Sequence, residues 1–328
     1  MLDGKLFRFM PLIDFPLQEL NEYSGRNPRP ADFDEFWDAS LDEMRALDPE
    51  VEFVRAEFQA RNVDCFHMWF TGTGGARIHA KLLKPAIPAG KAPAVLQFHG
   101  YSASSGDWSE KLNYVSQGFI VAALDCRGQG GLSEDTLSVK GTTLNGHIVR
   151  GLDDCPERMY YRNVFLDTAL LARIVMDLPQ VDPDRVVATG GSQGGGLTLA
   201  CAALEPRIRK AAPWFPFLCD YLRVWEMDQD VAAYDELRKF FRHHDPLHSR
   251  KEVIFERLGY IDVQHLASRI KADVLMGTGL MDTICPPSTQ FAAYNKIRST
   301  KEVVVYPDFG HEGLPGFGDR VFEFLTNV

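Results

Sequence analysis

The sequence ATGGSQGGG, residues 188–196, places a single serine among closely spaced glycines. Ser192 follows Gly190 and Gly191 and precedes the run 194–196. Glycine is tolerated at this density where the backbone needs a positive φ or where another segment passes very close. Three interpretations fit such a stretch: a phosphate-binding loop, a flexible turn, or a nucleophile held on a strained turn.

The sequence on either side of the stretch favours the third interpretation. RVVATGG (185–191) is an apolar, β-rich run, and Gly195–Leu204 predicts a helix. Residues 190–194 therefore fit G-x-S-x-G between a strand and a helix, which is the setting of a nucleophilic serine. On this turn the serine takes unfavourable φ and ψ, and the helix N-terminus adds partial positive charge where an oxyanion forms.

The phosphate-binding alternative lacks the residues that it needs. A phosphate loop of the form G-x-x-x-x-G-K-[ST] requires a lysine that is absent here. A dinucleotide site requires an acidic residue at the end of the next strand, and none stands there.

Short apolar runs alternate with amphipathic segments from residue 92 onward. The predicted strands are 92–100, 119–125, 185–191, 272–279 and 302–307, and the predicted helices are 108–117, 163–178, 195–204, 287–297 and 320–326. This alternation predicts a mostly parallel sheet covered by helices on both faces, within one α/β domain over residues 1–328.

The N-terminal part, residues 1–91, has a different pattern. Residues 30–47 predict a helix with one apolar face, and three β-like runs follow at 51–58, 63–72 and 76–85. Thr73-Gly74-Gly75 separates the last two runs and suggests a hairpin. We expect an antiparallel N-terminal extension of the sheet.

A second break in the alternation covers about residues 213–268. This segment is mostly helical and rich in aromatic residues. An insertion of such size at the ends of the strands usually covers a site. We therefore expect an inserted helical lid.

Composition limits the classes of partner. The net charge of −10 argues against a nucleic acid, because phosphate binding relies on clustered Lys and Arg. The longest apolar runs, such as 119–124, are far shorter than the ~20 residues that span a bilayer, and the first residues lack the pattern of a signal peptide. The six cysteines are scattered, which favours buried thiols over disulfides and predicts no metal site.

A serine nucleophile needs a histidine as base and a carboxylate that orients the histidine. In hydrolases of this type the chain order is serine, acid, histidine, with the last two on loops after later strands. Asp282 follows the predicted strand 272–279, and His311, the only histidine after Asp282, follows the strand 302–307. These positions predict the triad Ser192, Asp282 and His311.

Alternatives exist for the acid and for the residues around it. Asp308 is a rival acid, although it lies on the same loop as His311. Asp282 could instead cap the helix that starts near Pro286. Glu312 is expected to anchor the loop.

An oxyanion hole commonly combines the amide after the nucleophile with one from the loop after an early strand. Gln193 supplies the first amide. The loop His99-Gly100-Tyr101 follows the predicted strand 92–98, and Gly100 permits a turn that directs the Tyr101 amide toward the site.

Several segments together resemble carbohydrate esterase family seven, the acetyl xylan esterase and cephalosporin C deacetylase family. They are HGYSAS (99–104), DCRGQGG (125–131), GGSQGGG (190–196), GLMDTICPPSTQFAAYN (279–295), GHE (310–312) and PLQELNEYSGRNPRPADFDEFWDASL (16–41). RGQ, GxSQG and HE in this order are specific for that family, and the resemblance covers almost the whole chain. The segment Thr142–Leu152 departs from the family pattern.

The resemblance implies an α/β-hydrolase that removes acetyl groups from small acetylated sugars, xylo-oligosaccharides and cephalosporin C, without a cofactor. It implies an intracellular, cytoplasmic protein that assembles as a hexamer. It also implies that the Tyr101 and Gln193 amides form the oxyanion hole, that Arg127 and Gln129 tie the loop beneath the site, and that Pro216 lines a short acyl pocket. Tyr101 and Trp108 are further candidates for substrate binding, although Trp108 could equally pack the helix 108–117.

Two other functions remain open at this stage. The same triad could serve a dienelactone hydrolase-like or peptidase-like enzyme, although the dienelactone type has cysteine where Ser192 stands. A non-catalytic binding protein on a hydrolase fold is the third possibility, and the intact serine, aspartate and histidine argue against it.

Overall fold

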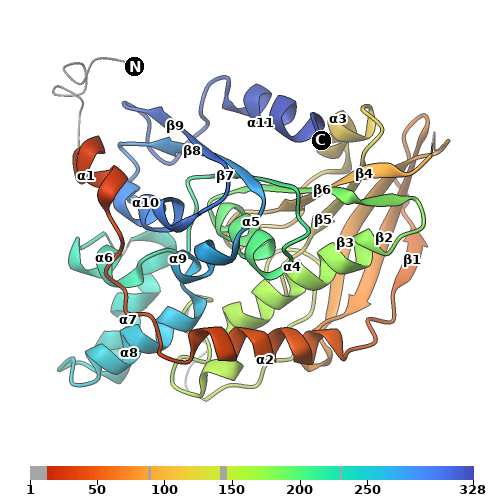
Figure 1. The fold of residues 1–328 in the computed structure, drawn as a ribbon. Coiled ribbons are helices and arrows are strands. Elements are labelled where there is room, and N and C mark those ends of the chain that lie inside the picture. Colours follow the sequence, from red (N-terminus) through yellow and green to blue (C-terminus); the bar gives the residue numbers. More distant parts are fainter. Residues whose placement is uncertain (1–12, 88–89, 141–145, 230) are drawn as a thin grey trace.

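The computed structural model describes residues 13–87, 90–140, 146–229 and 231–328. A nine-stranded sheet in the order β1-β2-β3-β5-β4-β6-β7-β8-β9 runs through its centre (Figure 1). Neighbouring strands from β5 to β9 are parallel, whereas β1, β2, β3 and β5 pair antiparallel. The predicted α/β fold and its antiparallel N-terminal strands are confirmed.

The elements have the following bounds. The strands are β1 (Glu52–Arg55), β2 (Val63–Thr71), β3 (Arg77–Pro85), β4 (Ala92–Phe98), β5 (Ile120–Leu124), β6 (Val181–Gly191), β7 (Lys210–Trp214), β8 (Asp273–Gly279) and β9 (Lys301–Tyr306). The helices are α1 (Leu17–Glu22), α2 (Phe33–Arg45), α3 (Leu112–Val115), α4 (Tyr160–Met176), α5 (Gln193–Leu204), α6 (Tyr221–Glu226), α7 (Asp235–His244), α8 (Lys251–Leu258), α9 (Val263–Leu266), α10 (Pro287–Lys296) and α11 (Phe317–Thr326).

Strand β7 was not predicted from the sequence. Its residues KAAPW contain a lysine and a proline, so neither alternation nor a continuous apolar run marks it. The strand forms because it fills the gap between β6 and β8, with Val187 opposite Lys210 and Trp214 opposite Gly277. The predicted start of the insertion at residue 213 therefore lies inside a strand. The predicted helix 108–117 is also shorter than expected, since only a 3₁₀ turn and the four residues of α3 form there.

Side chains of the sheet alternate between two buried layers. Val95, Val121 and Val187 face a cluster that includes residues of α3 and α11. Their neighbours Leu96 and Ala122 face the larger cluster, which includes α4 and α5. Figure 1 shows α3 and α11 on one side of the sheet and α4 and α5 on the other. This two-sided burial explains why the central strands read as continuous apolar runs.

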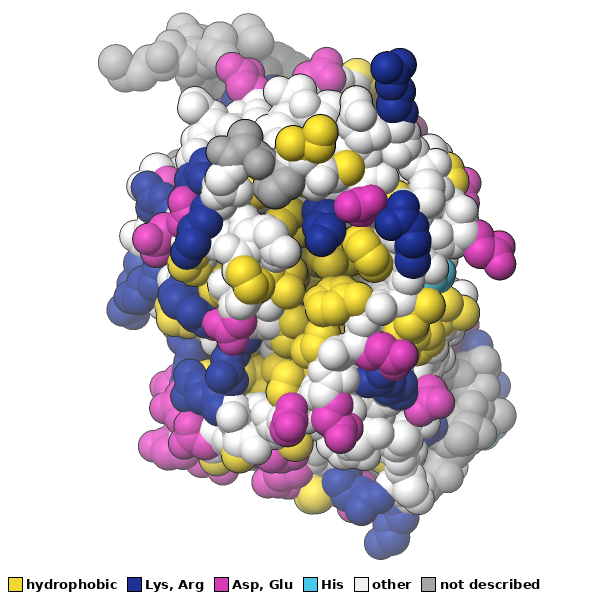
Figure 2. All heavy atoms as spheres, turned by 90° about the vertical axis from the view of Figure 1, so that its right-hand side faces the viewer, with side chains coloured by type: hydrophobic (Ala, Val, Ile, Leu, Met, Phe, Trp, Pro, Cys, Tyr) yellow, Lys and Arg dark blue, Asp and Glu magenta, His cyan; other side chains and the backbone are white. Residues whose placement is uncertain are grey.

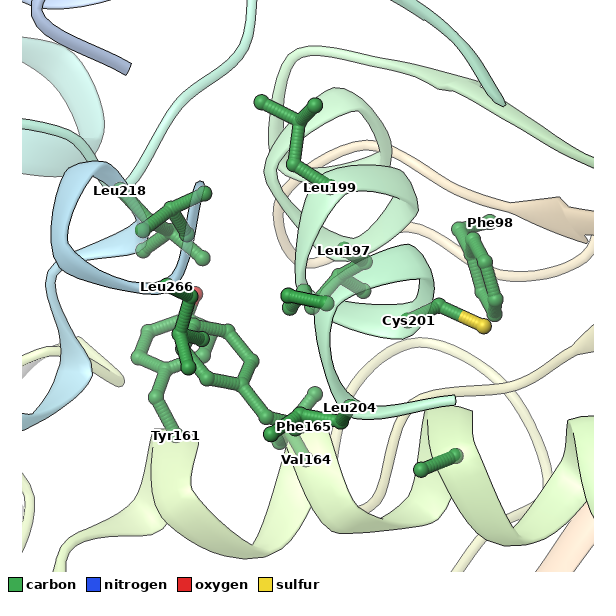
Figure 3. Packing of buried hydrophobic residues seen from close by; sticks show 14 of the residues in the cluster. Phe98, Tyr161, Val164, Phe165, Leu197, Leu199, Cys201, Leu204, Leu218 and Leu266 are labelled. Carbon is green, nitrogen blue, oxygen red and sulfur yellow. The ribbon is translucent and has the colours of Figure 1, made fainter. Parts of the chain in front are cut away.

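Helix α5 is buried along its whole length. Figure 3 shows its side chains Leu197, Cys201 and Leu204 among Phe98 at the end of β4 and Phe165 of α4. A helix that is apolar all round is typical of the centre of a large domain. Because α5 follows Ser192 directly, its surroundings fix the position of that residue.

Helices α6 to α9 follow β7 along the chain and precede β8, and Figure 1 shows them at the left. Their use as a lid remains a prediction. Asp220 and Asp262 link them to the N-terminal segment: the Asp220 carboxylate accepts hydrogen bonds from Tyr23 Oη (2.7 Å) and from the Asn27 amide (2.7 Å). The Asp220 amide in turn donates to the Asp262 carboxyl group at 3.0 Å.

No helix among the residues described is long and apolar enough to cross a membrane.

The burial of Asp262 predicts a pH-dependent stability. Burial, together with the nearby Asp220 carboxylate, raises the pKa of Asp262 from 3.8 to about 7. Its protonation therefore stabilises the fold at low pH, and this contribution is lost as the pH rises through about 7. We expect the melting temperature of Asp262→Asn, relative to the unmodified protein, to increase between about pH 5 and pH 8.5. If the melting temperatures of the variant and of the unmodified protein change with pH in parallel, the prediction is wrong. Asp42→Asn, on the exposed face of α2, is the control.

Candidate active site

Three residues from three separate loops form a continuous hydrogen-bonded chain. Ser192 follows β6, Asp282 follows β8, and His311 follows β9. His311 Nε2 lies 3.0 Å from Ser192 Oγ, and His311 Nδ1 lies 2.9 Å from Asp282 Oδ2. Parallel strands end at one edge of the sheet, which is why residues distant in sequence meet there. The order serine, acid, histidine predicted this arrangement.

The backbone of Ser192 is strained. Its φ of 57° and ψ of −121° lie in a region that side-chain-bearing residues rarely adopt. The Ser192 amide donates to Trp214 O (3.1 Å), and its carbonyl accepts from the Phe217 amide (3.0 Å). Contacts to the segment after β7 thus hold the turn in place.

The glycines around Ser192 are required by the close approach of backbone from other segments and of the Trp214 side chain. A Cβ on Gly194 would lie 2.1 Å from Phe98 O, and one on Gly191 would lie 2.0 Å from the Trp214 ring nitrogen. A Cβ on Gly195 would lie 2.8 Å from Trp214 O. These distances explain the composition of the stretch: glycine lets β6 and α5 pack against two other strand ends.

Asp282 is fully buried and has two roles. Its Oδ1 accepts from the amides of Ile284 and Cys285, both at 2.8 Å, while Oδ2 faces His311. The Gln290 side chain also donates to Oδ2 at 3.3 Å. Asp282 does not cap α10, because the N-cap residue of that helix is Pro286 and no side chain caps it. The carboxylate instead bonds the turn before the helix and the imidazole of His311.

The rival residues on the loop after β9 lie elsewhere. Asp308 is exposed, and the imidazole of His311 pairs with Asp282. Glu312 is also exposed, and its side chain accepts from the Gly310 amide at 3.0 Å. Glu312 thus holds the loop that carries His311.

The Gln193 side chain supports the loop after β4. The side-chain amides of Gln193 and Gln129 bond each other: Gln129 Nε2 donates to Gln193 Oε1 at 2.8 Å, and Gln193 Nε2 donates to Gln129 Oε1 at 3.0 Å. Gln193 Nε2 also donates to Gly100 O at 3.3 Å. Gln129 also accepts from the Ser102 amide at 2.9 Å. Within this loop the pKa of His99 is lowered by burial, so its ring is neutral.

The remaining parts of the RGQ and oxyanion segments lie as follows. Arg127 is buried and holds Asp167 of α4 with two bonds of 2.7 Å. The Tyr101 hydroxyl donates to the Glu236 carboxyl group of α7 at 2.6 Å. The backbone amides of Tyr101 and Gln193 are the predicted oxyanion donors. The role of these amides stays a prediction.

The two other predicted pocket residues lie in different places. Pro216 is buried beside α5, with its Cα 3.0 Å from the position of a Cβ on Gly195. The neighbouring Phe215 ring lies 4.4 Å from that of His311. Trp108 instead stacks on Phe58 and meets His67 of β2 edge-on, toward the antiparallel part of the sheet. Its predicted role in substrate binding stays a prediction.

Cys285 was not singled out from the sequence. Its thiol, the Asp282 carboxylate and the His311 imidazole lie within 4.8 Å of one another, a donor set that a soft cation could use. A cation there would compete with the hydrogen bonds that already join Asp282, His311 and Ser192. Burial raises the pKa of the Cys285 thiol well above its ordinary value, so the group is protonated near neutral pH. Only the position of Cys285 three residues after the acid could have indicated it.

Comparison with known proteins shows the family. A family model described as acetyl xylan esterase (AXE1) matches residues 10–328. The chain belongs to the acetyl xylan esterase family. It is thus a carboxylic ester hydrolase with the α/β-hydrolase fold.

Three known esterases are similar to this chain over nearly its whole length. The structure of acetyl xylan esterase 1 from Thermoanaerobacterium sp. JW/SL YS485 superposes with a TM-score of 0.95 at 57% identity, covering 96% of this chain and 99% of that one. The acetyl xylan esterase from Paenibacillus sp. R4 gives 0.91 at 35% identity, covering 95% and 99%. The acetyl esterase Axe7A of Xylanibacter ruminicola is 28% identical over 312 residues, which are 93% of this chain and 68% of that protein.

The packing of Gly194 predicts a sharp mutational effect. Gly194→Ala would force a Cβ against Phe98 O, so the turn must shift and carry Ser192 away from His311. We expect kcat/KM for p-nitrophenyl acetate to fall at least about tenfold, with a loss of about 1–3 kcal/mol in unfolding free energy. Gly313→Ala is the matched control, because no atom of the residues described, apart from the chain neighbours of Gly313, lies within 4 Å of the position of a Cβ there. Equal activity and stability of both variants would show that the turn tolerates a side chain.

Proposed function

We propose that this esterase removes acetyl groups from small acetylated carbohydrates such as xylo-oligosaccharides, and from cephalosporin C, through an acetyl-enzyme on Ser192. The observation that carries the proposal is the chain Ser192–His311–Asp282, with contacts of 3.0 and 2.9 Å. The names of its relatives, acetyl xylan esterase and acetyl esterase, support the acetyl group as the acyl part.

In the first half-reaction Ser192 Oγ attacks the acetyl carbonyl while His311 Nε2 takes the hydroxyl proton. The Asp282 carboxylate holds the imidazole through Nδ1–H and stabilises the imidazolium that forms. The amides of Tyr101 and Gln193 bind the oxyanion, an effect worth roughly 3 kcal/mol per donor. The bond between the acetyl carbon and the sugar oxygen then breaks, and His311 gives its proton to that oxygen, which leaves as a hydroxyl group.

The second half-reaction repeats these steps with water. His311 Nε2 takes a proton from water as its oxygen attacks the acetyl carbon of acetyl-Ser192. The second oxyanion collapses, the bond to Ser192 Oγ breaks, and His311 returns the proton to Ser192. Acetic acid leaves and loses its proton to solvent to give acetate, and the starting state is restored.

The segment after β7 supports a short acyl pocket. Phe215 packs against His311 at 4.4 Å, and Pro216 follows it against α5. Both residues are buried and lie beside the nucleophile, where a longer acyl chain would meet them. Steric overlap is the physical basis for a preference for acetate over butyrate.

The alternatives make different demands on this site. A dienelactone hydrolase-like enzyme would want a thiol where Ser192 stands, and Cys285 does not replace it because burial keeps its thiol protonated. A peptidase-like enzyme needs room for a peptide on the acyl side of the site, where Phe215 and Pro216 lie. A non-catalytic protein has no need of the strained φ of Ser192, which costs stability.

A hexameric assembly in the cytoplasm completes the proposal. Figure 2 shows apolar side chains gathered in a hollow at the antiparallel end of the molecule. One pocket there, about 240 Å³ in volume, is lined by Phe53, Phe66, Leu82, Lys84, Ile120, Leu178, Pro179 and Gln180. An apolar face of this kind supports contact with another subunit. All six cysteines are free thiols, which suits a reducing compartment.

The nucleophile and the acyl preference are tested together. Ser192→Ala should lower kcat/KM for p-nitrophenyl acetate by at least about 10⁴-fold, because no other group takes over the attack. Ser116→Ala, at an exposed serine, is the control and should keep full activity. The unmodified enzyme should release acetate from acetylated xylo-oligosaccharides and cephalosporin C and should hydrolyse the acetate ester faster than the butyrate. Preference for octanoate or for an aminoacyl-proline anilide would contradict the proposal.

A further inference from the structure

Glu236 is a carboxyl group buried at a junction of three segments. It lies in the first turn of α7, within the insertion between β7 and β8, and is only 2% exposed. Its two oxygens face the loop after β4 and the segment 146–149. Burial of an ionisable group is costly unless it is hydrogen-bonded, so the hydrogen-bond partners of Glu236 determine whether its burial is tolerated.

The partners of Glu236 are all neutral donors in the part of the chain that the structure describes. Tyr101 Oη donates to Oε1 at 2.6 Å, the His147 amide donates to Oε1 at 3.2 Å, and the Val149 amide donates to Oε2 at 3.0 Å. The His147 amide also donates to Tyr101 Oη at 3.1 Å. Among side-chain groups, only the carboxylate has two oxygens that can both accept hydrogen bonds from these three donors.

The segment 146–149 is shaped to receive this carboxyl group. Gly146 has a φ of +88°, and a Cβ there would lie 2.1 Å from the carboxyl carbon of Glu236. His147 lies 4.8 Å from the Tyr101 ring, and its Nε2 is 3.1 Å from Ser102 Oγ. This segment belongs to the stretch 142–152, for which the sequence predicted a departure from the family pattern; residues 142–145 of that stretch are not among those that the structure describes.

The loop that carries the Tyr101 amide is therefore held from two sides. On the side of the sheet, the paired side chains of Gln193 and Gln129 bond Gly100 and Ser102. On the side of the insertion, Glu236 bonds the end of the Tyr101 side chain. Removing either support would let this amide move relative to Ser192, and a displacement of about 1 Å can cost 10²-fold in rate.

We propose that Glu236 is a positioning residue, which sets the Tyr101 amide for the oxyanion and couples that setting to the helices of the insertion. The proposal rests on the proposed function, because it takes the Tyr101 amide as an oxyanion donor. Glu236 acts through Tyr101 and has no part in the proton transfers.

The ionisation of Glu236 gives this role a pH dependence. Burial raises the pKa of Glu236 from 4.5 to about 8, against the hydrogen bonds that favour the carboxylate. The ionisable groups that face it are Tyr101 and His147, with Tyr161 of α4, Tyr221 of α6 and Asp235 of its own helix nearby. The carboxylate, which accepts from all its donors, predominates above about pH 8, so turnover should rise through that pH.

The experiment compares five proteins with p-nitrophenyl acetate between about pH 6 and pH 9: the unmodified enzyme, Glu236→Gln, Tyr101→Phe, their double variant, and Asp235→Asn. We expect each single variant to lower kcat about 10- to 100-fold with KM changed less than about threefold. The double variant should fall little further, because both changes remove the same bond. The rise of kcat near pH 8 should vanish in Glu236→Gln and Tyr101→Phe.

Asp235→Asn is the matched control, because it removes a carboxylate from the same helical turn at an exposed ion pair with Lys239. Its kcat should equal that of the unmodified enzyme, and its pH profile should keep the rise of kcat, displaced only slightly to lower pH by the loss of the nearby negative charge. If Glu236→Gln fails to fold, Tyr101→Phe tests the same bond from its other end. The proposal is wrong if Tyr101→Phe keeps kcat within about twofold, or if both single variants keep the pH profile. Full turnover by Ser192→Ala would instead refute the proposed function.

Discussion

The left-handed backbone at Ser192 is the constraint on which the site depends. A φ of 57° at a residue with a side chain costs about 1–3 kcal/mol and persists only where the surroundings enforce it. The surroundings here are Phe98 at the end of β4 and Trp214 at the end of β7, which approach so closely that Gly191 and Gly194 admit no Cβ. The hydrogen bonds of the sheet fix the spacing of the central strands, and glycine at these two positions lets the turn fit within that spacing. In return, the hydroxyl is held at the sheet edge beside the first turn of α5.

Charge in the site is arranged before any substrate arrives. Asp282 is removed from water, and the amides of Ile284 and Cys285 replace its hydration. Its remaining oxygen is thus directed at the imidazole of His311. Such fixed dipoles need no reorganisation when charge develops during the reaction, which is the usual source of catalytic power in ester hydrolysis.

Much of this could be predicted from the sequence, because local signals marked it. The strand-to-helix context of Ser192 and the unique histidine after Asp282 predicted three residues that the structure joins. Strand β7 was missed because its short sequence carries no periodicity, and only its neighbours β6 and β8 make it a strand. Glu236 was missed for a related reason. On an amphipathic helix rich in charged residues a glutamate predicts a solvated face, and the burial of Glu236 arises from segments about 90 and 135 residues away in the chain.

The link between Asp220 and the N-terminal residues Tyr23 and Asn27 joins positions separated by more than 190 residues. During synthesis, the N-terminal segment leaves the ribosome long before its partner exists. Strands β1, β2 and β3 can pair early, but the lead-in to α2 must wait for the helices of the insertion. Native pairing of this region therefore follows synthesis of at least the first 220 of the 328 residues, and contacts over such separations form slowly. Chaperones that shield apolar segments such as the α2 face would act in that interval.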